Sequence, residues 1–293
     1  MNRKNDKNSL YLIWAVAIVA CLLIVMFSLL FASVTRGSGV DITTAPPSSE
    51  GSAPAPGGEG EGENTPPEGQ GENGDPSGIP SAEPVSSAQL AETEDAGQDY
   101  IDRLTFLGDS TTNGLKEYGV LSGGEGTTQV WTPRSGTLTL YLWNAAPIVY
   151  PETGEEMTIA AAVAAKQPEY LVITLGVNGV AELTEENFKL YYTDLVNAVL
   201  ANSPTTKVIC NSIYPVENDY QHIDQISNAK IDAANGWIRA VAEATGTKYT
   251  DSCSVLKAED GSLREDYGNG DGLHLNADGY NAVLQYLRTH AYL

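Results

Sequence analysis

Apolar and polar positions from residue 100 onward follow two periods that alternate along the chain. Short apolar runs, rich in β-branched and aromatic residues and leucine, predict strands. These runs lie at 103–107, 128–131, 170–175 and 207–212, with a weaker one at 247–250. The run YLVITL at 170–175 is apolar almost throughout, which is typical of a parallel strand covered on both faces.

Longer stretches between these runs carry apolar residues at helical spacing. They predict helices at 158–165, 185–201 and 223–244, and a last helix that opens near Asn276. Strands that alternate with helices predict a parallel sheet with helices on both faces, which is a three-layer α/β/α fold. In such sheets the functional residues follow the carboxyl ends of the strands.

The first 34 residues predict a membrane anchor. Residues 1–9 form a short basic tail, and residues 10–34 are apolar and uncharged. At 1.5 Å per residue this run can span a bilayer core, and it is longer than the apolar part of a cleaved signal peptide. Because more basic residues precede the span than follow it, we expect a cytoplasmic N-terminus and an extracytoplasmic remainder.

Residues 35–99 predict a disordered linker. They are rich in proline, glycine, serine and glutamate, and carry no lysine or arginine after Arg36. Such a segment has too few apolar side chains to offset the entropy of ordering the chain. We interpret it as a passive stalk between the anchor and a globular domain at 100–293.

Charge and cysteine content narrow the classes of partner and cofactor. The 293-residue chain has a formal net charge of −22, which argues against nucleic acid as a partner. No Cys-x-x-Cys spacing exists, so we predict no structural zinc site and no other cofactor. Cys210 and Cys253 follow two strands that could be neighbours. Either a disulfide or two buried free thiols fits this placement.

Four polar clusters lie in the predicted loops, three of them after predicted strands. They are Gly108-Asp109-Ser110, Arg134-Ser135-Gly136, Gly176-Val177-Asn178-Gly179 and Asp271-Gly272-Leu273-His274. Acyl transfer needs a serine, a histidine base, a carboxylate that orients the histidine, and donors that face the developing oxyanion.

The clusters supply every one of these parts. Ser110 is the predicted nucleophile, His274 the base and Asp271 the orienting acid. The N–H groups of Ser110 and Gly136 and the side-chain amide of Asn178 are the predicted oxyanion donors. Arg134 fits two interpretations equally, a ligand of an anionic or carbonyl group of the substrate or a solvated loop arginine.

At these residues the chain resembles the SGNH, or GDSL-type, hydrolase family. Gly108-Asp109-Ser110 is similar to the first motif of that family, Gly176-x-Asn178 to the third, and Asp271-x-x-His274 to the last. The resemblance covers Asp102 to Leu293. It implies a flavodoxin-like fold with a five-stranded parallel sheet and an esterase mechanism without a metal. It also implies an oxyanion hole made by Ser110 N–H, a glycine N–H of the second motif and the Asn178 side chain.

Two departures from the family pattern concern the second and third motifs. Gly179 stands where the third motif has aspartate. That aspartate is a supporting residue, so the change bears on the rigidity of the loop more than on the chemistry. The second motif is weakly marked. Gly136 is its best candidate, although other glycines lie between the first and third motifs.

Together these features predict an extracytoplasmic serine esterase that hydrolyses O-acyl esters, with O-acetyl esters on cell-envelope glycans as the expected substrates. The partners expected are an acylated small molecule or polysaccharide and the membrane that holds the anchor. Two alternatives stay open. One is a lipase, thioesterase or acyltransferase of the same fold, and the other is a non-catalytic glycan-binding descendant of it.

Overall fold

The computed structural model describes residues 87–293. The tail predicted at 1–9, the membrane span predicted at 10–34 and most of the predicted linker lie outside the described residues. Within 87–293, no helix has both the length and the apolar character needed to cross a membrane.

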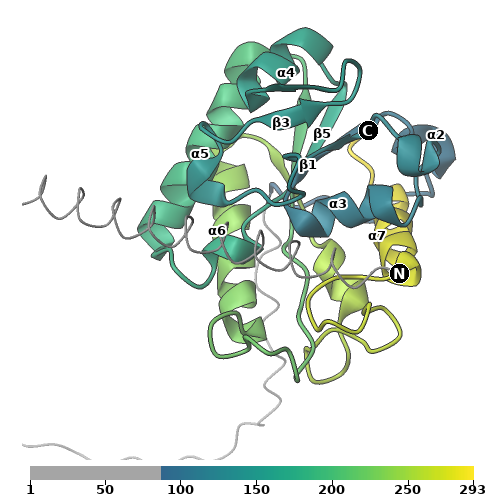
Figure 1. Cartoon of the computed structure of the whole chain (residues 1–293), viewed down its shortest axis with the longest axis vertical. Helices are drawn as coiled ribbons and strands as arrows, with labels where there is room; N and C mark the ends of the chain where they lie inside the picture. Colours follow the sequence, from purple (N-terminus) through teal and green to yellow (C-terminus); the bar gives the residue numbers. More distant parts are fainter. Residues whose placement is uncertain (1–86) are drawn as a thin grey trace, which may run out of the picture. The chain divides into compact units, whose positions relative to one another are not determined.

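A five-stranded parallel sheet forms the centre of the domain (Figure 1). Its strands are β1 (Leu104–Gly108), β2 (Val130–Trp131), β5 (Tyr170–Thr174), β6 (Lys207–Asn211) and β7 (Lys248–Thr250), in the order β2-β1-β5-β6-β7. The predicted strands all appear in it. The first is shifted by one residue toward the C-terminus, and the other four are shorter than predicted by one or two residues at an end. The parallel α/β fold expected from the alternation of strands and helices is therefore confirmed.

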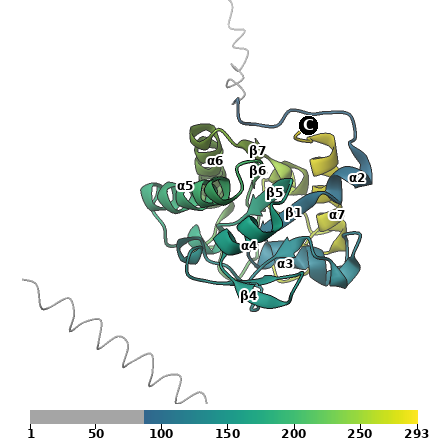
Figure 2. The same ribbon diagram turned by 90° about the horizontal axis from the view of Figure 1, so that it is seen from above.

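Helices cover both faces of the sheet (Figure 2). On one face lie α4 (Ile159–Lys166), α5 (Glu185–Asn202) and α6 (Asn228–Thr245), and on the other lie α2 (Gly97–Ile101), α3 (Ser110–Glu117) and α7 (Ala277–Thr289). Side chains that alternate along β1 separate into two apolar clusters. Leu107 packs with the first set of helices, whereas Leu104 and Phe106 pack with the second.

Helix starts follow hydrogen-bonding side chains rather than the apolar pattern alone. Helix α6 begins at Asn228, five residues after the predicted start, because Ser227 caps it by accepting a hydrogen bond from Lys230 N. Asn276 caps α7 in the same way through Gly279 N, as its position in the sequence predicted. Residues 87–293 also contain four short 3-10 helices: η1 (Gly124–Gly126), η2 (Leu140–Leu142), η3 (Val177–Gly179) and η4 (Ser252–Leu256).

The domain begins before residue 100, where the prediction had placed the end of the linker. Ala88 and Leu90 are buried, and Gln89 pairs with Tyr249 of the edge strand β7 as a parallel bridge. Asp95 then forms two hydrogen bonds with the guanidinium of Arg288 on α7. The polar composition of this stretch predicted a linker, but its backbone completes the sheet edge and its few apolar residues enter the core.

A two-stranded hairpin made of β3 (Ile148–Tyr150) and β4 (Glu155–Met157) was not predicted. Its strands are three residues long, too short to show a period of two clearly. Cys210 and Cys253 are both free and buried, which agrees with the second of the two alternatives left open. Burial raises the pKa of each thiol to about 12.

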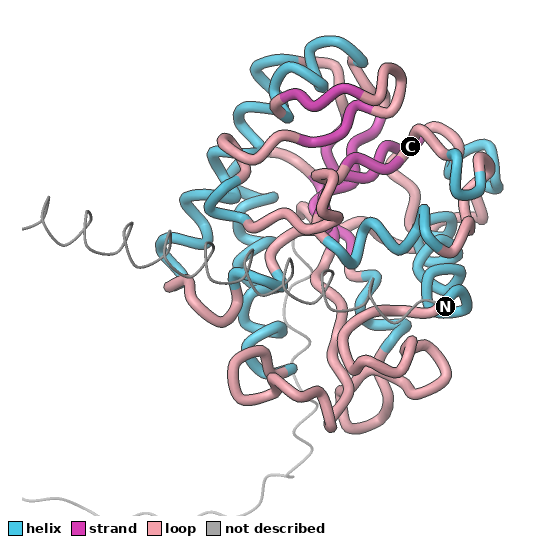
Figure 3. Tube along the Cα trace, in the orientation of Figure 1, coloured by secondary structure: helices cyan, strands magenta, loops and turns pink. Residues whose placement is uncertain are grey.

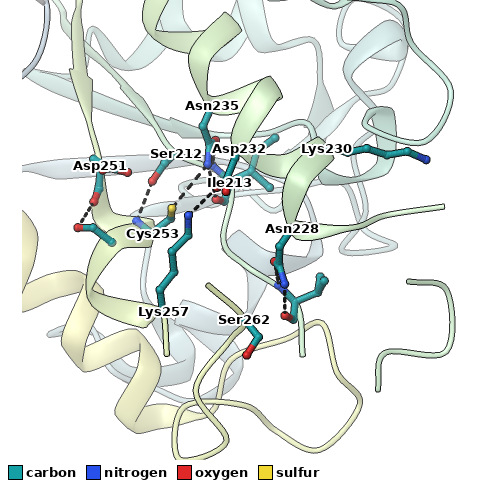
Figure 4. Close-up of polar contacts among 12 residues, drawn as sticks. Ser212, Ile213, Asn228, Lys230, Asp232, Asn235, Asp251, Cys253, Lys257 and Ser262 are labelled. Carbon is teal, nitrogen blue, oxygen red and sulfur yellow. Dashed lines mark hydrogen bonds and ion pairs between the residues drawn. The ribbon is translucent and has the colours of Figure 1, made fainter. Parts of the chain in front are cut away.

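Long loops gather at one end of the molecule, where the chain leaves β6 and η4 (Figure 3). Two asparagines of α6 hold the segment that follows β6. Asn235 makes two hydrogen bonds with the backbone of Ile213, as Figure 4 shows, and Asn228 makes two with the backbone of Val216. The next residue, Glu217, donates its N–H to Gly272 O at 2.8 Å. Helix α6 therefore supports the loop that carries Asp271 and His274.

Candidate active site

Ser110 is the first residue of α3 and lies two positions beyond the last residue of strand β1. Gly108 allows this tight strand-to-helix turn. A Cβ atom at position 108 would lie 2.1 Å from both Thr112 Oγ1 and the carbonyl oxygen of Thr174 on β5. Only glycine lets α3 start this close to the neighbouring strand. The local sequence therefore places a half-buried serine at the carboxyl edge of the sheet, as the strand pattern predicted.

Asp109, the residue before Ser110, is buried and joins three parts of this edge. Its carboxylate accepts hydrogen bonds from the N–H and hydroxyl of Thr111 at 3.0 and 2.7 Å, and from Gly176 N at 3.4 Å. Burial raises the pKa of Asp109, and the hydrogen bonds from Thr111 and Gly176 oppose this rise. Asp109 thus caps α3 and ties it to the loop that follows β5.

A hydrogen-bonded chain joins three of the predicted residues. His274 Nε2 lies 2.8 Å from Ser110 Oγ, and His274 Nδ1 lies 2.8 Å from Asp271 Oδ2. Ser110 is 164 positions away from His274 in the sequence, so the fold alone brings them together. With the proton on Nδ1, Nε2 is free to accept the serine proton, which is the arrangement that activates a serine hydroxyl.

The loop at 269–274 holds Asp271 rigidly. Asp271 Oδ1 accepts hydrogen bonds from Leu273 N and His274 N, both at 2.8 Å. Partial burial alone would raise the pKa of Asp271, but these backbone hydrogen bonds, together with the contact to the His274 ring, lower it to about 2. Asp271 is therefore ionised at neutral pH and oriented toward His274 Nδ1.

A cavity of about 270 Å³ opens beside Ser110. Its walls come from α3, from the loop after β2, from α7 and from the loop at 269–274. The predicted residues Ser110, Gly136, Asp271 and His274 all line it, and Glu117, Tyr118 and Tyr280 line it as well. The cavity is small, and several of the residues that line it are polar.

The three predicted oxyanion donors are in different situations. Ser110 opens α3, so its N–H lies at the N-terminus of that helix. Gly136 lines the cavity with a φ of +76°, but its N–H donates to Pro133 O at 2.8 Å. Asn178 lies in η3, at the same edge of the sheet, and its amide is 3.5 Å from Leu138 O. Gly136 N–H would have to leave Pro133 before it could reach a substrate.

Arg134 lies apart from this cavity. Its Nε forms an ion pair with Glu156 of the β3–β4 hairpin at 3.2 Å, and its side chain lines a neighbouring cavity. A larger cavity of about 650 Å³ lies on the far side of the 269–274 loop, where Glu217, Asp219 and Glu265 line it. That larger cavity contains neither Ser110 nor His274. Within residues 87–293, no group of three His, Cys, Asp or Glu side chains is arranged to hold a metal ion.

Two residues of the site were missed by the sequence reasoning. Asn269 makes two hydrogen bonds with Asp271, and Asn113 lies on α3 between the Ser110 cavity and its neighbour. A signal existed for Asn269, because asparagine two residues before a turn often bonds to the backbone there. No sequence motif marks Asn113. Its contact with Thr132 depends on the tertiary fold, and its contact with Glu117 joins two residues one helical turn apart.

Comparisons with known proteins bear on the same region. The GDSL-like Lipase/Acylhydrolase family model matches residues 106–282, which is more than half of the chain. No curated protein matches the sequence.

Several solved structures are similar to this chain. One is a GDSL-like lipase from Bacteroides thetaiotaomicron VPI-5482, with 19% identity and a TM-score of 0.45, covering 64% of this chain and 86% of that chain. Another is a carbohydrate esterase family 3 protein from Talaromyces cellulolyticus, with 19% identity and a TM-score of 0.42, covering 63% of this chain and 93% of that chain. A third is the periplasmic domain of the lipopolysaccharide acetyltransferase of Salmonella ser. Paratyphi A, with 16% identity and a TM-score of 0.45, covering 63% of this chain and 82% of that chain.

Proposed function

Because the chain belongs to the GDSL-like lipase/acylhydrolase family, we propose that it hydrolyses carboxylic esters with Ser110 as the nucleophile. The observation that carries this proposal is the distance of 2.8 Å between His274 Nε2 and Ser110 Oγ. A serine hydroxyl needs a base within hydrogen-bond reach to become nucleophilic, and His274 is in reach without any movement of the loop.

The reaction proceeds in two halves. Ser110 Oγ attacks the ester carbonyl carbon while its proton moves to His274 Nε2. The tetrahedral intermediate then collapses, and the same proton passes from Nε2 to the departing alcohol. A water molecule, deprotonated by His274, attacks the acyl-serine and releases the carboxylic acid and free Ser110. The ionised Asp271 stabilises the imidazolium that forms in each half.

Stabilisation of the oxyanion involves Ser110 N–H, Asn178 and Gly136. The first lies at the N-terminus of α3, where backbone N–H groups favour negative charge. Gly136 joins the set when the turn from Pro133 to Gly136 opens and frees its N–H. The opening of this turn accompanies substrate binding, because Gly136 lines the cavity that the acyl ester enters.

Short acyl groups, acetyl above all, are the proposed substrates. The support is the cavity of about 270 Å³, whose lining includes the Glu117 carboxylate and the Asp271 carboxylate. A long alkyl chain would have to displace water from these charged groups without replacing their hydrogen bonds, which is unfavourable.

The apolar run at 10–34 and the acidic segment that follows it support a location of the domain on the extracytoplasmic side of the membrane. Acylated glycans of the cell envelope are the proposed natural substrates there.

Aryl esters of acetate, butyrate and octanoate test the proposal with the full chain in a mild detergent. We expect acetate to be hydrolysed fastest, and Ser110→Ala to lower kcat/KM by at least about a thousandfold. Ser254→Ala is the matched control, because Ser254 is exposed on η4 and does not line the cavity. Turnover that is equal in Ser110→Ala and the wild type would refute the role of Ser110, and faster hydrolysis of octanoate would favour a lipase.

A further inference from the structure

Within residues 87–293, the Lys116 side chain has no ion-pair or hydrogen-bond partner, and it lies on the helix that begins with Ser110. The other lysine and arginine side chains of this part of the chain form ion pairs or donate hydrogen bonds, with the exception of Arg239. Arg239 is exposed on α6, on the other face of the sheet from α3. Lys116 is exposed on α3.

Lys116 lines two cavities that differ in charge. Glu117 and Glu125 also line the first, which has a volume of about 420 Å³, whereas no acidic residue lines the second. The second cavity has a volume of about 250 Å³ and lies between α3, the end of β2 and the hairpin strand β3. Lys116 and Arg134 are its charged residues. Arg134 contacts Glu156 through Nε and Gly154 O through Nη2, so its Nη1 makes no hydrogen bond.

Asn113 forms a common wall between this cavity and the cavity beside Ser110. Its side chain is held from both sides, since it donates to Glu117 Oε1 at 2.7 Å and accepts from the Thr132 hydroxyl at 3.1 Å. The two neighbouring cavities therefore differ in charge. Carboxylates of Glu117 and Asp271 line the one at Ser110, and two cations line the other.

We propose that Lys116 and Arg134 form a subsite for an anionic group, a carboxylate or a phosphate, on the alcohol portion of the ester. This inference rests on the proposed esterase function and adds a substrate class to it. Lys116 lies six positions after Ser110, which is about 9 Å along the helix. A short acyl group cannot span that length, so the alcohol portion is the part of the substrate that reaches Lys116.

Local charge gives this subsite its selectivity. The chain as a whole has a net charge of −22 and repels anions at long range. Physiological salt screens that repulsion beyond about 8–10 Å from a surface charge. A cation in direct contact with the anion still attracts it. An acylated polymer of uronic acids and an acylated polymer of sugar phosphates both present the anion that the subsite would bind.

Three acetylated substrates of similar size test the inference with the full chain: a neutral disaccharide, a uronic-acid disaccharide and a disaccharide phosphate. The measured quantity is the ratio of kcat/KM for each anionic substrate to that for the neutral one. We expect the wild type to favour at least one anionic substrate by about fivefold at low salt, with a smaller ratio at high salt. Comparing the ratio for the uronic-acid disaccharide with the ratio for the disaccharide phosphate shows whether the subsite prefers a carboxylate or a phosphate.

Substitutions assign the preference to the subsite. Lys116→Gln should bring the ratio close to one, and Lys116→Glu should bring it below one. Arg134→Gln should lower the ratio to a smaller extent, because Arg134 already contacts Glu156. Arg239→Gln, which removes the other cation of residues 87–293 that forms no ion pair, should leave the ratio as in the wild type.

The outcomes separate this inference from the proposed function. A wild type that cleaves the neutral substrate but shows no preference for either anion overturns the subsite and leaves the esterase intact. If no ester is cleaved, the proposed function fails, and binding of the deacetylated uronate and phosphate disaccharides by calorimetry tests the subsite alone. Binding that weakens in Lys116→Gln supports the subsite, and binding that is absent or unchanged refutes it.

Discussion

Asn269 and Asp271 hold each other by two hydrogen bonds. Asn269 Nδ2 donates to Asp271 Oδ2 at 3.2 Å, and Asp271 N donates to Asn269 Oδ1 at 2.9 Å. Asp271 Oδ2 is the same atom that contacts His274 Nδ1, and Asn269 N also donates to His274 O. Asn269 is therefore a positioning residue for the carboxylate and for the backbone that carries the proposed base.

Replacing Asn269 should impair the orientation of Asp271 and not the binding of substrate. We expect Asn269→Ala to lower kcat for an aryl acetate by about tenfold, with a smaller change in KM. Loss of the donor should also raise the pKa of Asp271 from about 2, which a carboxyl NMR titration can measure. Asn218→Ala is the control, because Asn218 lines the larger, acidic cavity and is not among the residues that line the cavity at Ser110. An unchanged kcat together with an unchanged pKa of Asp271 would contradict the role of Asn269.

The lowered pKa of Asp271 predicts how stability depends on acid pH. The pKa of this carboxyl is about 2 in the folded chain, whereas an ordinary exposed aspartate has a pKa of 3.8. This carboxylate therefore contributes stability that is present above about pH 4 and is lost as the pH falls through 2. The side chain is 48% exposed, so the contribution is small.

Thermal unfolding at pH 6, 4, 3 and 2 measures this effect. We expect the difference in Tm between the wild type and Asp271→Asn to shrink as the pH falls from 4 to 2. Asp194→Asn is the comparison for a general loss of negative charge, because this exposed side chain of α5 makes no hydrogen bond within residues 87–293. A difference in Tm that stays constant, or that changes equally in Asp194→Asn, would count against the prediction.

Gly114 determines how closely α3 approaches α7. A Cβ atom at this position would lie 2.0 Å from the hydroxyl oxygen of Tyr280, which is buried and donates to Thr111 O at 2.7 Å. We expect Gly114→Ala to destabilise the chain by about 2 kcal/mol, because the Tyr280 ring cannot move away without losing this hydrogen bond.

Gly236→Ala is the matched control, since Gly236 is also helical and a Cβ atom added there would meet no atom within 4 Å. That change should be neutral or stabilise by up to about 1 kcal/mol. Urea unfolding gives both values. Tyr280→Phe in the Gly114→Ala background should recover part of the loss, and a double mutant that is fully additive would argue against direct contact.

The segment at 87–99 should contribute to the stability of the domain. A fragment spanning 87–293 keeps the bridge between Gln89 and Tyr249 and the burial of Leu90, whereas a fragment spanning 100–293 loses both. We expect the shorter fragment to unfold at a lower temperature by several degrees, because the edge of β7 and the end of α7 lose their cover. Asp95→Asn in the longer fragment isolates the contact with Arg288, and equal Tm values for the two fragments would show that the segment is dispensable.

Much of the fold follows from local patterns. The run at 170–175 predicts β5 as a buried strand because it is apolar on both faces, and Gly108 with Ser110 predicts a strand-to-helix turn. Asn276 predicts the start of α7 through its capping side chain. These features depend on neighbouring residues only, so the sequence reveals them without knowledge of the tertiary structure.

Prediction was weaker where a segment's structure depends on distant partners. The segment at 87–99 has the composition of a linker, and its order arises from pairing with β7 and from the contact of Asp95 with Arg288. The β3–β4 hairpin is too short for its period to be visible. The N–H of Gly136 is held by Pro133, which the spacing of glycines along the chain could not reveal.

The sequence by itself determined which residue types are available for the chemistry and at which strand ends they lie. Ser110, Asp271 and His274 were predicted as site residues from their motifs, because each motif is short and follows or precedes a recognisable element. Only the tertiary structure decided that Asn269 braces Asp271 and that Lys116 and Arg134 line one cavity beyond Asn113. The physical reason is that hydrogen bonds and shared cavities form between residues far apart in the chain, and their geometry exists only once the sheet and its helices are packed.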